Sequence, residues 1–174
     1  MMNDISSGTI SDVPPAKKPA EILRMVEIVF PNMTNHYGTM FGGKVADLMD
    51  RAAFLASTRF SNQAMVTASM ELLDFFVAVK SGNIVELLAQ VVYTGRTSIT
   101  IKVDLYSEDP LRKTRAHASQ GYFHLVSVDN KGKPIPVPSL IITTVEEKTE
   151  WEYARFLLVQ RKNRATQKQS SIKN

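Results

Sequence analysis

The stretch of sequence that decides the fold is residues 42–56, Gly42-Gly43-Lys44-Val45-Ala46-Asp47-Leu48-Met49-Asp50-Arg51-Ala52-Ala53-Phe54-Leu55-Ala56. Counted from Val45, apolar residues recur in it at i+3, i+4, i+7, i+8 and i+11, which is the spacing of one helix face. The pattern predicts a helix from the two glycines to about Phe60. Its stripe of small and medium side chains favours close packing against a sheet.

Strand-like segments lie on both sides of this helix. One precedes it, at 22–30, and four follow it, at 66–76, 84–94, 98–107 and 115–129, all dense in β-branched and aromatic residues. Short polar turns separate the last four. One strand, one long helix and then a meander predict an α+β fold, in which an antiparallel β-sheet is wrapped around a central α-helix.

The two ends of the chain differ from this domain, which we place at 21–145. Residues 1–20 are rich in Ser, Asp, Pro and Lys and predict a disordered leader. A C-terminal helix is expected at 146–162, followed by a basic disordered tail at 163–174. Residues 161–174 carry five of the 21 basic residues and no acidic one, so the rest of the chain is nearly neutral. The net charge of +4 therefore does not indicate a nucleic-acid partner.

Several classes of protein are excluded by what the sequence lacks. Cysteine is absent, which excludes disulfides and thiolate catalysis. No stretch approaches the ~18 apolar residues of a membrane span, and residues 1–20 contain no apolar signal region. We therefore expect a cytoplasmic protein without a membrane span. Motifs of serine hydrolases, zinc proteases and nucleotide-binding enzymes are also missing.

The three histidines do not predict a metal site. His36, His117 and His124 are not at metal-ligand spacing, so no metal is expected. His117 and His124 lie seven residues apart in one predicted strand, which would place them on opposite faces of the sheet. Each is expected to be a packing or surface residue.

Two features of the predicted helix carry chemistry. The first-turn amides at Gly42 and Gly43 have no intrahelical partner, so they could stabilise an oxyanion, or the glycines could simply make a tight turn. Asp50 lies off the apolar stripe and could be a solvated carboxylate. Phe54, one turn later, indicates instead that a second protomer covers this face, which would place Asp50 near a dimer interface.

The segment around the helix start resembles a known family. Residues 35–44, Asn-His-Tyr-Gly-Thr-Met-Phe-Gly-Gly-Lys, together with Met49-Asp50, are similar to the signature of hot-dog acyl-CoA thioesterases, in the branch of the bacterial short- and medium-chain acyl-CoA hydrolases and the brain-type cytosolic acyl-CoA hydrolase. Residues 66–69, 95–99 and 118–134 match in the same order, so the resemblance covers about residues 22–140. Some relatives carry histidine where Phe41 stands.

The resemblance implies a hot-dog fold and an acyl-CoA thioesterase that needs no cofactor, since coenzyme A is part of the substrate. It implies homo-oligomers, dimers at least and a trimer of dimers, with sites at the dimer interface. Asp50 would act as general base or nucleophile, Asn35 of the facing protomer would place the water or thioester, and Gly42 or Gly43 would donate an amide to the thioester oxygen. The implied coenzyme A contacts are Gly95, Arg96, Thr97 and Ser98, with Arg112, Lys113 and Arg115 for the phosphates.

Two other functions occur on the same fold. A hydroxyacyl dehydratase needs a histidine with a carboxylate, and His36, fourteen residues before Asp50, does not resemble that arrangement. An acyl-CoA-sensing module normally carries a DNA-binding segment, for which the 20-residue leader is too short. The resemblance therefore favours hydrolysis over both.

Overall fold

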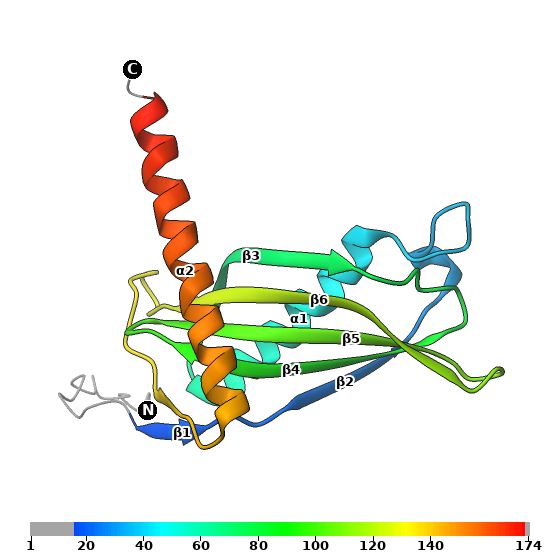
Figure 1. The fold of residues 1–174 in the computed structure, drawn as a ribbon, viewed down its shortest axis with the longest axis horizontal. Helices are drawn as coiled ribbons and strands as arrows, with labels where there is room; N and C mark the ends of the chain where they lie inside the picture. The colour runs from blue at the N-terminus through cyan, green and yellow to red at the C-terminus, as the bar shows by residue number, and fades with distance from the viewer. Residues whose placement is uncertain (1–15, 173–174) are drawn as a thin grey trace, which may run out of the picture.

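The computed structural model describes residues 16–172. Five antiparallel strands form one curved sheet in the order β2-β4-β5-β6-β3, wrapped around the helix α1, Gly42–Ser61 (Figure 1). The strands are β2 (Leu23–Ile28), β3 (Met65–Phe75), β4 (Ile84–Thr94), β5 (Ser98–Asp109) and β6 (Thr114–Ser127). The predicted α+β plan is confirmed, and each predicted strand is found within two residues at either end.

The core lies between α1 and the concave face of the sheet. Leu48, Met49, Ala52 and Ala53 of α1 are fully buried, as the stripe predicts. The side chains facing them from the sheet are likewise fully buried, among them Leu87, Ile101 and Phe123. At its far end α1 stops at Asn62, whose left-handed backbone (φ 55°) lets its N–H bond to the carbonyl of Thr58.

The second helix, α2 (Val145–Ile172), crosses the outer face of the sheet. Thr144 and Glu147 form a capping box at its start: the Glu147 N–H donates to Thr144 Oγ1, and the Thr144 N–H donates to Glu147 Oε2, both at 3.1 Å. Hydrogen bonds from Thr143 and Thr144 lower the pKa of the Glu147 carboxyl. Ala154 and Leu157 then pack on the sheet.

The helix α2 runs ten residues further than predicted, so the disordered tail expected at 163–174 is helical as far as Ile172. Polarity suggested disorder, but 163–172 contains no glycine or proline to end a helix. The ion pair between Arg164 and Glu71 of β3 attaches this part of α2 to the edge of the sheet. Beyond that ion pair the end of α2 projects away from the sheet (Figure 1).

The expected leader differs from the structure in its last residues. Lys17–Pro19 form the strand β1, which pairs in parallel with β7, Ser139–Ile141. Residues 1–15 lie outside the described residues. In the part of the chain that the structure covers, no helix has the length and apolarity needed to cross a bilayer.

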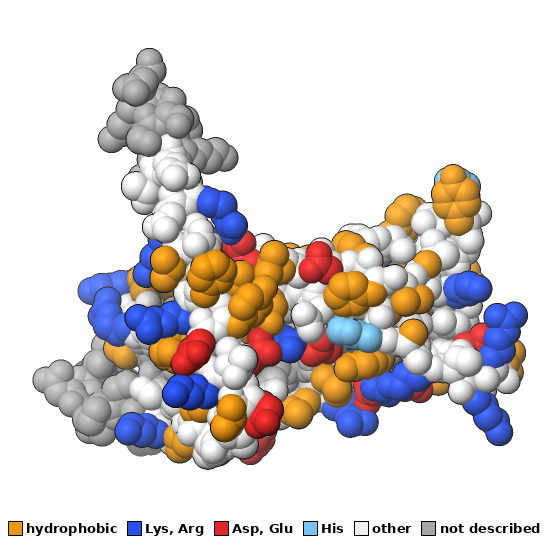
Figure 2. All heavy atoms as spheres, in the orientation of Figure 1, with side chains coloured by type: hydrophobic (Ala, Val, Ile, Leu, Met, Phe, Trp, Pro, Cys, Tyr) orange, Lys and Arg blue, Asp and Glu red, His pale blue; other side chains and the backbone are white. Residues whose placement is uncertain are grey.

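The outer face of the sheet carries both histidines of β6. His117 Nε2 lies 2.8 Å from Asp104 Oδ1, and His124 Nδ1 lies 2.8 Å from Thr100 Oγ1. The expectation that they lie on opposite faces is wrong, because a register shift at Leu105/Tyr106 adds a residue to β6 and turns His117 outward. Acidic, basic and hydrophobic side chains alternate across this face and along α2 (Figure 2).

Candidate active site

Asp50 lies in the middle of α1, where a residue of β3 holds its side chain. The Thr67 hydroxyl donates to Asp50 Oδ1 at 2.8 Å, and Asp50 is partly exposed. A hydrogen bond from a hydroxyl fixes one carboxylate oxygen and leaves the other free to accept a proton. Arg51, the next residue, pairs with Asp47 at 3.4 Å, so it does not neutralise Asp50.

The start of α1 presents free amide groups. Phe41 has an extended backbone and no side chain caps the helix, and the N–H groups of Gly42 and Gly43 make no hydrogen bond to any described residue. The helix dipole adds partial positive charge at this point. A carbonyl oxygen that becomes negative could be stabilised here.

Asn35 closes the loop that precedes α1. Its Oδ1 accepts from Tyr37 N at 2.9 Å, from Thr39 N at 3.3 Å and from Thr39 Oγ1 at 3.2 Å. The carbonyl side of the amide is therefore occupied, whereas the Nδ2 group is not bonded to any residue that the structure covers. Asn35 can donate hydrogen bonds to a ligand but has little capacity left to accept them.

These groups do not converge within one protomer. Gly42 and Asp50 lie eight residues apart on α1, and at 1.5 Å per residue the separation along the helix is about 12 Å. A single thioester carbonyl would need the oxyanion donor and the carboxylate within about 3–4 Å of its atoms. The loop of Asn35 and the amide of Gly42 thus form one half of a site, and Asp50 with Thr67 forms another half.

Apolar side chains around the second half are exposed in the single protomer. Phe54 and Leu55 of α1 are each 42% exposed, and Met70 of β3 is 44% exposed. β3 is also the last strand of the sheet, and its outer edge pairs with no strand among residues 16–172. A surface of this kind is typical of a protein–protein interface, as the sequence predicted from Phe54.

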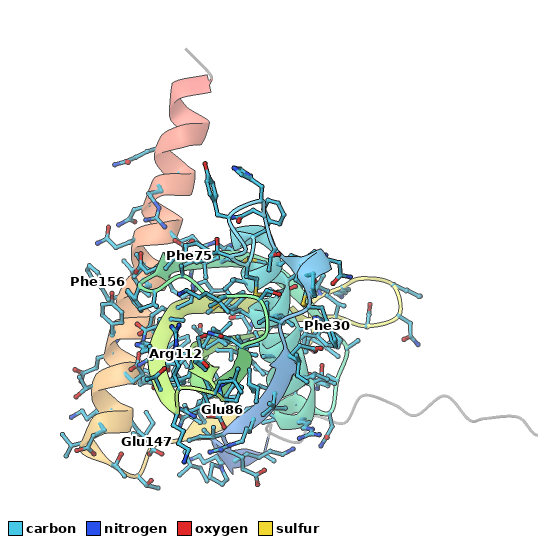
Figure 3. The ribbon with its side chains drawn as sticks, turned by 90° about the vertical axis from the view of Figure 1, so that its right-hand side faces the viewer. Phe30, Phe75, Glu86, Arg112, Glu147 and Phe156 are labelled. Carbon is cyan, nitrogen blue, oxygen red and sulfur yellow. The ribbon has the colours of Figure 1, made fainter. Side chains whose placement is uncertain are left out.

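The predicted coenzyme A contacts lie in two places. Gly95–Ser98 form the turn between β4 and β5, with a hydrogen bond from the Gly95 N–H to the Ser98 carbonyl at 2.8 Å. Arg112, Lys113 and Arg115 lie in the β5–β6 hairpin, at the end of the molecule that faces the viewer in Figure 3. The 12 residues of β5 separate the two groups by roughly 35–40 Å. One protomer therefore does not bring them together.

The three hairpin cations differ in their exposure and in the carboxylates that they contact. Arg115 pairs with Glu86, a buried carboxylate, and with Glu108, and its guanidinium lies 4.3 Å from the ring centre of Tyr106. These carboxylates raise the pKa of Arg115 and already balance its charge. Arg112 is largely exposed, with Asp109 at 3.7 Å. The exposed Arg112 and Lys113 are thus better placed for phosphates than Arg115.

The structure shows what Thr67 and His36 contact. The role of Thr67 as the partner of Asp50 was missed, although 66–69 is one of the matched segments; only the fold shows that this hydroxyl points at α1. His36 lies against Tyr37, with ring centres 3.8 Å apart and the rings tilted by 41°, and makes no ion pair in the described part of the chain. It therefore lacks the carboxylate that a dehydratase would need.

Comparison with known proteins agrees with this fold. Residues 37–113 match the thioesterase superfamily. Protein VdlD of Helicobacter pylori is 34% identical over 77% of this chain and 74% of its own length. YkhA of Bacillus subtilis, named as an uncharacterized acyl-CoA thioester hydrolase, is 32% identical over 82% of this chain and 83% of its own length. Among solved structures, an apo hexameric acyl-CoA thioesterase has a TM-score of 0.82 and 38% identity, covering 86% of this chain and 97% of that one.

The acyl-CoA hydrolase of Staphylococcus aureus is also similar, with a TM-score of 0.79 and 30% identity over 87% of this chain and 93% of that one. It has been solved with butyryl coenzyme A and coenzyme A, and as alanine variants of an asparagine, an aspartate and a threonine. In that protein the aspartate follows the asparagine by 15 residues, and the threonine follows the aspartate by 17. Asn35, Asp50 and Thr67 have the same separations here.

The chain belongs to the thioesterase superfamily and has its hot-dog fold. Within that superfamily it is an acyl-CoA thioester hydrolase.

Proposed function

We propose that this chain hydrolyses acyl-CoA at a site shared by two protomers. Asp50, held by Thr67, comes from one protomer, and Asn35 comes from the other with the amide of Gly42 or Gly43. The observation that carries the proposal is the separation of about 12 Å along α1, which leaves each protomer with two incomplete halves. Homo-oligomers fit the hexameric state of similar thioesterases, and a trimer of dimers is the assembly we propose.

The chemistry needs few groups because a thioester is reactive. Asp50 takes a proton from water, the resulting hydroxide attacks the carbonyl carbon, and the carbonyl oxygen becomes an oxyanion on the glycine amides. When the tetrahedral intermediate collapses, the C–S bond breaks and the coenzyme A thiolate leaves and takes up a proton. In a second route Asp50 attacks the carbonyl carbon directly, the C–S bond breaks with loss of the coenzyme A thiolate, and water then hydrolyses the resulting mixed anhydride. Asn35 donates from Nδ2 to the water or the thioester in either route.

The second half of the proposal concerns the coenzyme A moiety. The turn 95–98 and the hairpin cations Arg112 and Lys113 lie at opposite ends of one sheet. A single coenzyme A molecule therefore contacts either the turn or the hairpin cations of one protomer, or it contacts the turn of one protomer and the cations of another. No further cofactor enters either route, and its absence, like the cytoplasmic location, stays a prediction.

The test is subunit complementation with the variants Asp50→Ala and Asn35→Ala. Each variant alone should lose at least about 100-fold of its thiol-release activity. Co-assembled at equal amounts, half of the dimers are mixed, and each mixed dimer holds one intact site. Activity should therefore return to about a quarter of the wild-type value.

The controls separate the possible failures. Each variant mixed with more of itself should remain inactive. If the co-assembled protein stays inactive while each variant is folded and dimeric, both residues act within one protomer and the shared site is wrong. If Asp50→Ala keeps full activity, the assignment of the carboxylate is wrong.

A further inference from the structure

An apolar cavity of ≈ 270 Å³ lies directly beside the start of α1. Its walls come from the loop before α1, from α1, from the end of β3, from the segment 76–79 and from β6. They include Met40, Val45, Val77, Val79 and Ala118. Gly42, whose amide is free, is part of the same wall. A cavity with these walls takes an apolar group better than a polar one.

Phe75, the last residue of β3, lines this cavity beside the start of α1. A Cβ placed on Gly42 would lie 3.4 Å from Cζ of the Phe75 ring, so the ring is in contact distance of the first turn of α1. The ring is nevertheless 54% exposed, so it is not fixed by a surrounding core. Figure 3 labels Phe75 at the end of the molecule that carries the start of α1.

The backbone on both sides of Phe75 departs from regular strand pairing. β3 shifts its register against β6 between Glu71 and Asp74, and Leu72 within the shift has φ 49°. Just after Phe75, the N–H groups of Phe76 and Val77 both donate to the Ala118 carbonyl. The bulge on one side and the shared acceptor on the other hold Phe75 at this place.

We infer that Phe75 limits the length of the acyl chain that the enzyme accepts. The inference rests on the proposed function: an acyl group whose carbonyl oxygen sits on the Gly42 amide has its alkyl chain beside this cavity. The cavity of ≈ 270 Å³ offers room for only part of a long alkyl chain, and the Phe75 ring is one of its walls.

The experiment compares specificity constants for straight-chain acyl-CoA substrates of increasing length. Phe75→Ala removes the ring and should raise the ratio of kcat/KM for a long chain over that for a short chain by about tenfold or more. Phe75→Trp should lower the same ratio. Because a ratio of two substrates on one preparation does not depend on the fraction of active enzyme, partial misfolding does not change it.

A matched control is available in Phe30, which is 52% exposed, close to the value for Phe75. It lies at the same end of the molecule, apart from Phe75 (Figure 3), and does not line the cavity. Phe30→Ala should keep the wild-type ratio. An unchanged ratio in both Phe75 variants, with wild-type activity that depends on Asp50, would overturn the inference alone. Absence of hydrolysis by the wild type with every substrate would overturn the proposed function, and this inference with it.

Discussion

Lowering the pH should destabilise the protein through one buried histidine. His124 is 1% exposed on the outer face of the sheet, with Thr100 Oγ1 at 2.8 Å from Nδ1 and no hydrogen-bond partner for Nε2 among the described residues. Burial, and then the positive charge of Arg161 on α2, lower the pKa of His124 to about 4, although Glu71 on β3 acts in the opposite direction.

The size of the effect follows from the two pKa values. In the unfolded chain His124 takes up a proton as the pH falls through about 6.5, whereas in the folded protein it stays neutral down to about 4. The free energy of unfolding is therefore unaffected above pH 6.5 and falls steadily from there to pH 4. The loss should reach about 2 kcal/mol at pH 5 and about 3 kcal/mol at pH 4.

The measurement is urea unfolding at pH 7.5 and pH 5, at one fixed protein concentration because oligomers unfold in a concentration-dependent way. Wild type should lose about 2 kcal/mol more than His124→Gln over this range, since carboxylates contribute equally to both proteins. His36→Gln replaces an exposed histidine and should follow the wild type. Equal pH dependence in wild type and His124→Gln would refute the reasoning.

Two further predictions concern packing. Glu150→Ala should lower the free energy of unfolding by about 2 kcal/mol, because it leaves Tyr122 and Lys102 without the carboxylate that they contact at 2.5 and 2.8 Å between the sheet and α2. Thermal unfolding measures this loss, with Glu152→Ala, at an exposed position of the same helix, as the control. Equal midpoints for the two variants would contradict the prediction. Ala53→Leu should lower the free energy of unfolding by about 1–3 kcal/mol, since Ala53 is fully buried against the sheet and a larger side chain overpacks the core. An unchanged midpoint of urea unfolding would contradict this prediction and show that the core has room for the extra atoms.

The central helix and the sheet were predictable because their signals are local. The apolar stripe from Val45 to Ala56 predicts which face of α1 is buried, and runs of β-branched residues bounded by turns predict the strands. The misjudged features depend on partners distant in sequence. The strand β1 exists because Lys17–Pro19 meet β7, and His117 faces outward because of a register shift between β5 and β6. Neither contact leaves a periodic pattern.

The candidate site was predictable only in its parts. A resemblance implied Asp50, Asn35 and the glycines, but helix periodicity alone treated Asp50 as a solvated carboxylate, because a wheel does not show what covers a face. The structure supplies two constraints on these residues: Thr67 reaches Asp50 from β3, and Asn35 has its carbonyl oxygen occupied by its own loop.

The rise of an α-helix turns these constraints into a requirement for a second protomer. Gly42 and Asp50 are on one rigid helix, so no side-chain rotation closes the distance of about 12 Å between them. Any route that uses both groups on one thioester must take them from two chains. The exposed Phe54 and Met70 near Asp50 and the outer edge of β3 offer the surface on which a second chain would pack. On this reasoning a protomer that folds but does not dimerise should bind parts of the substrate without hydrolysing it.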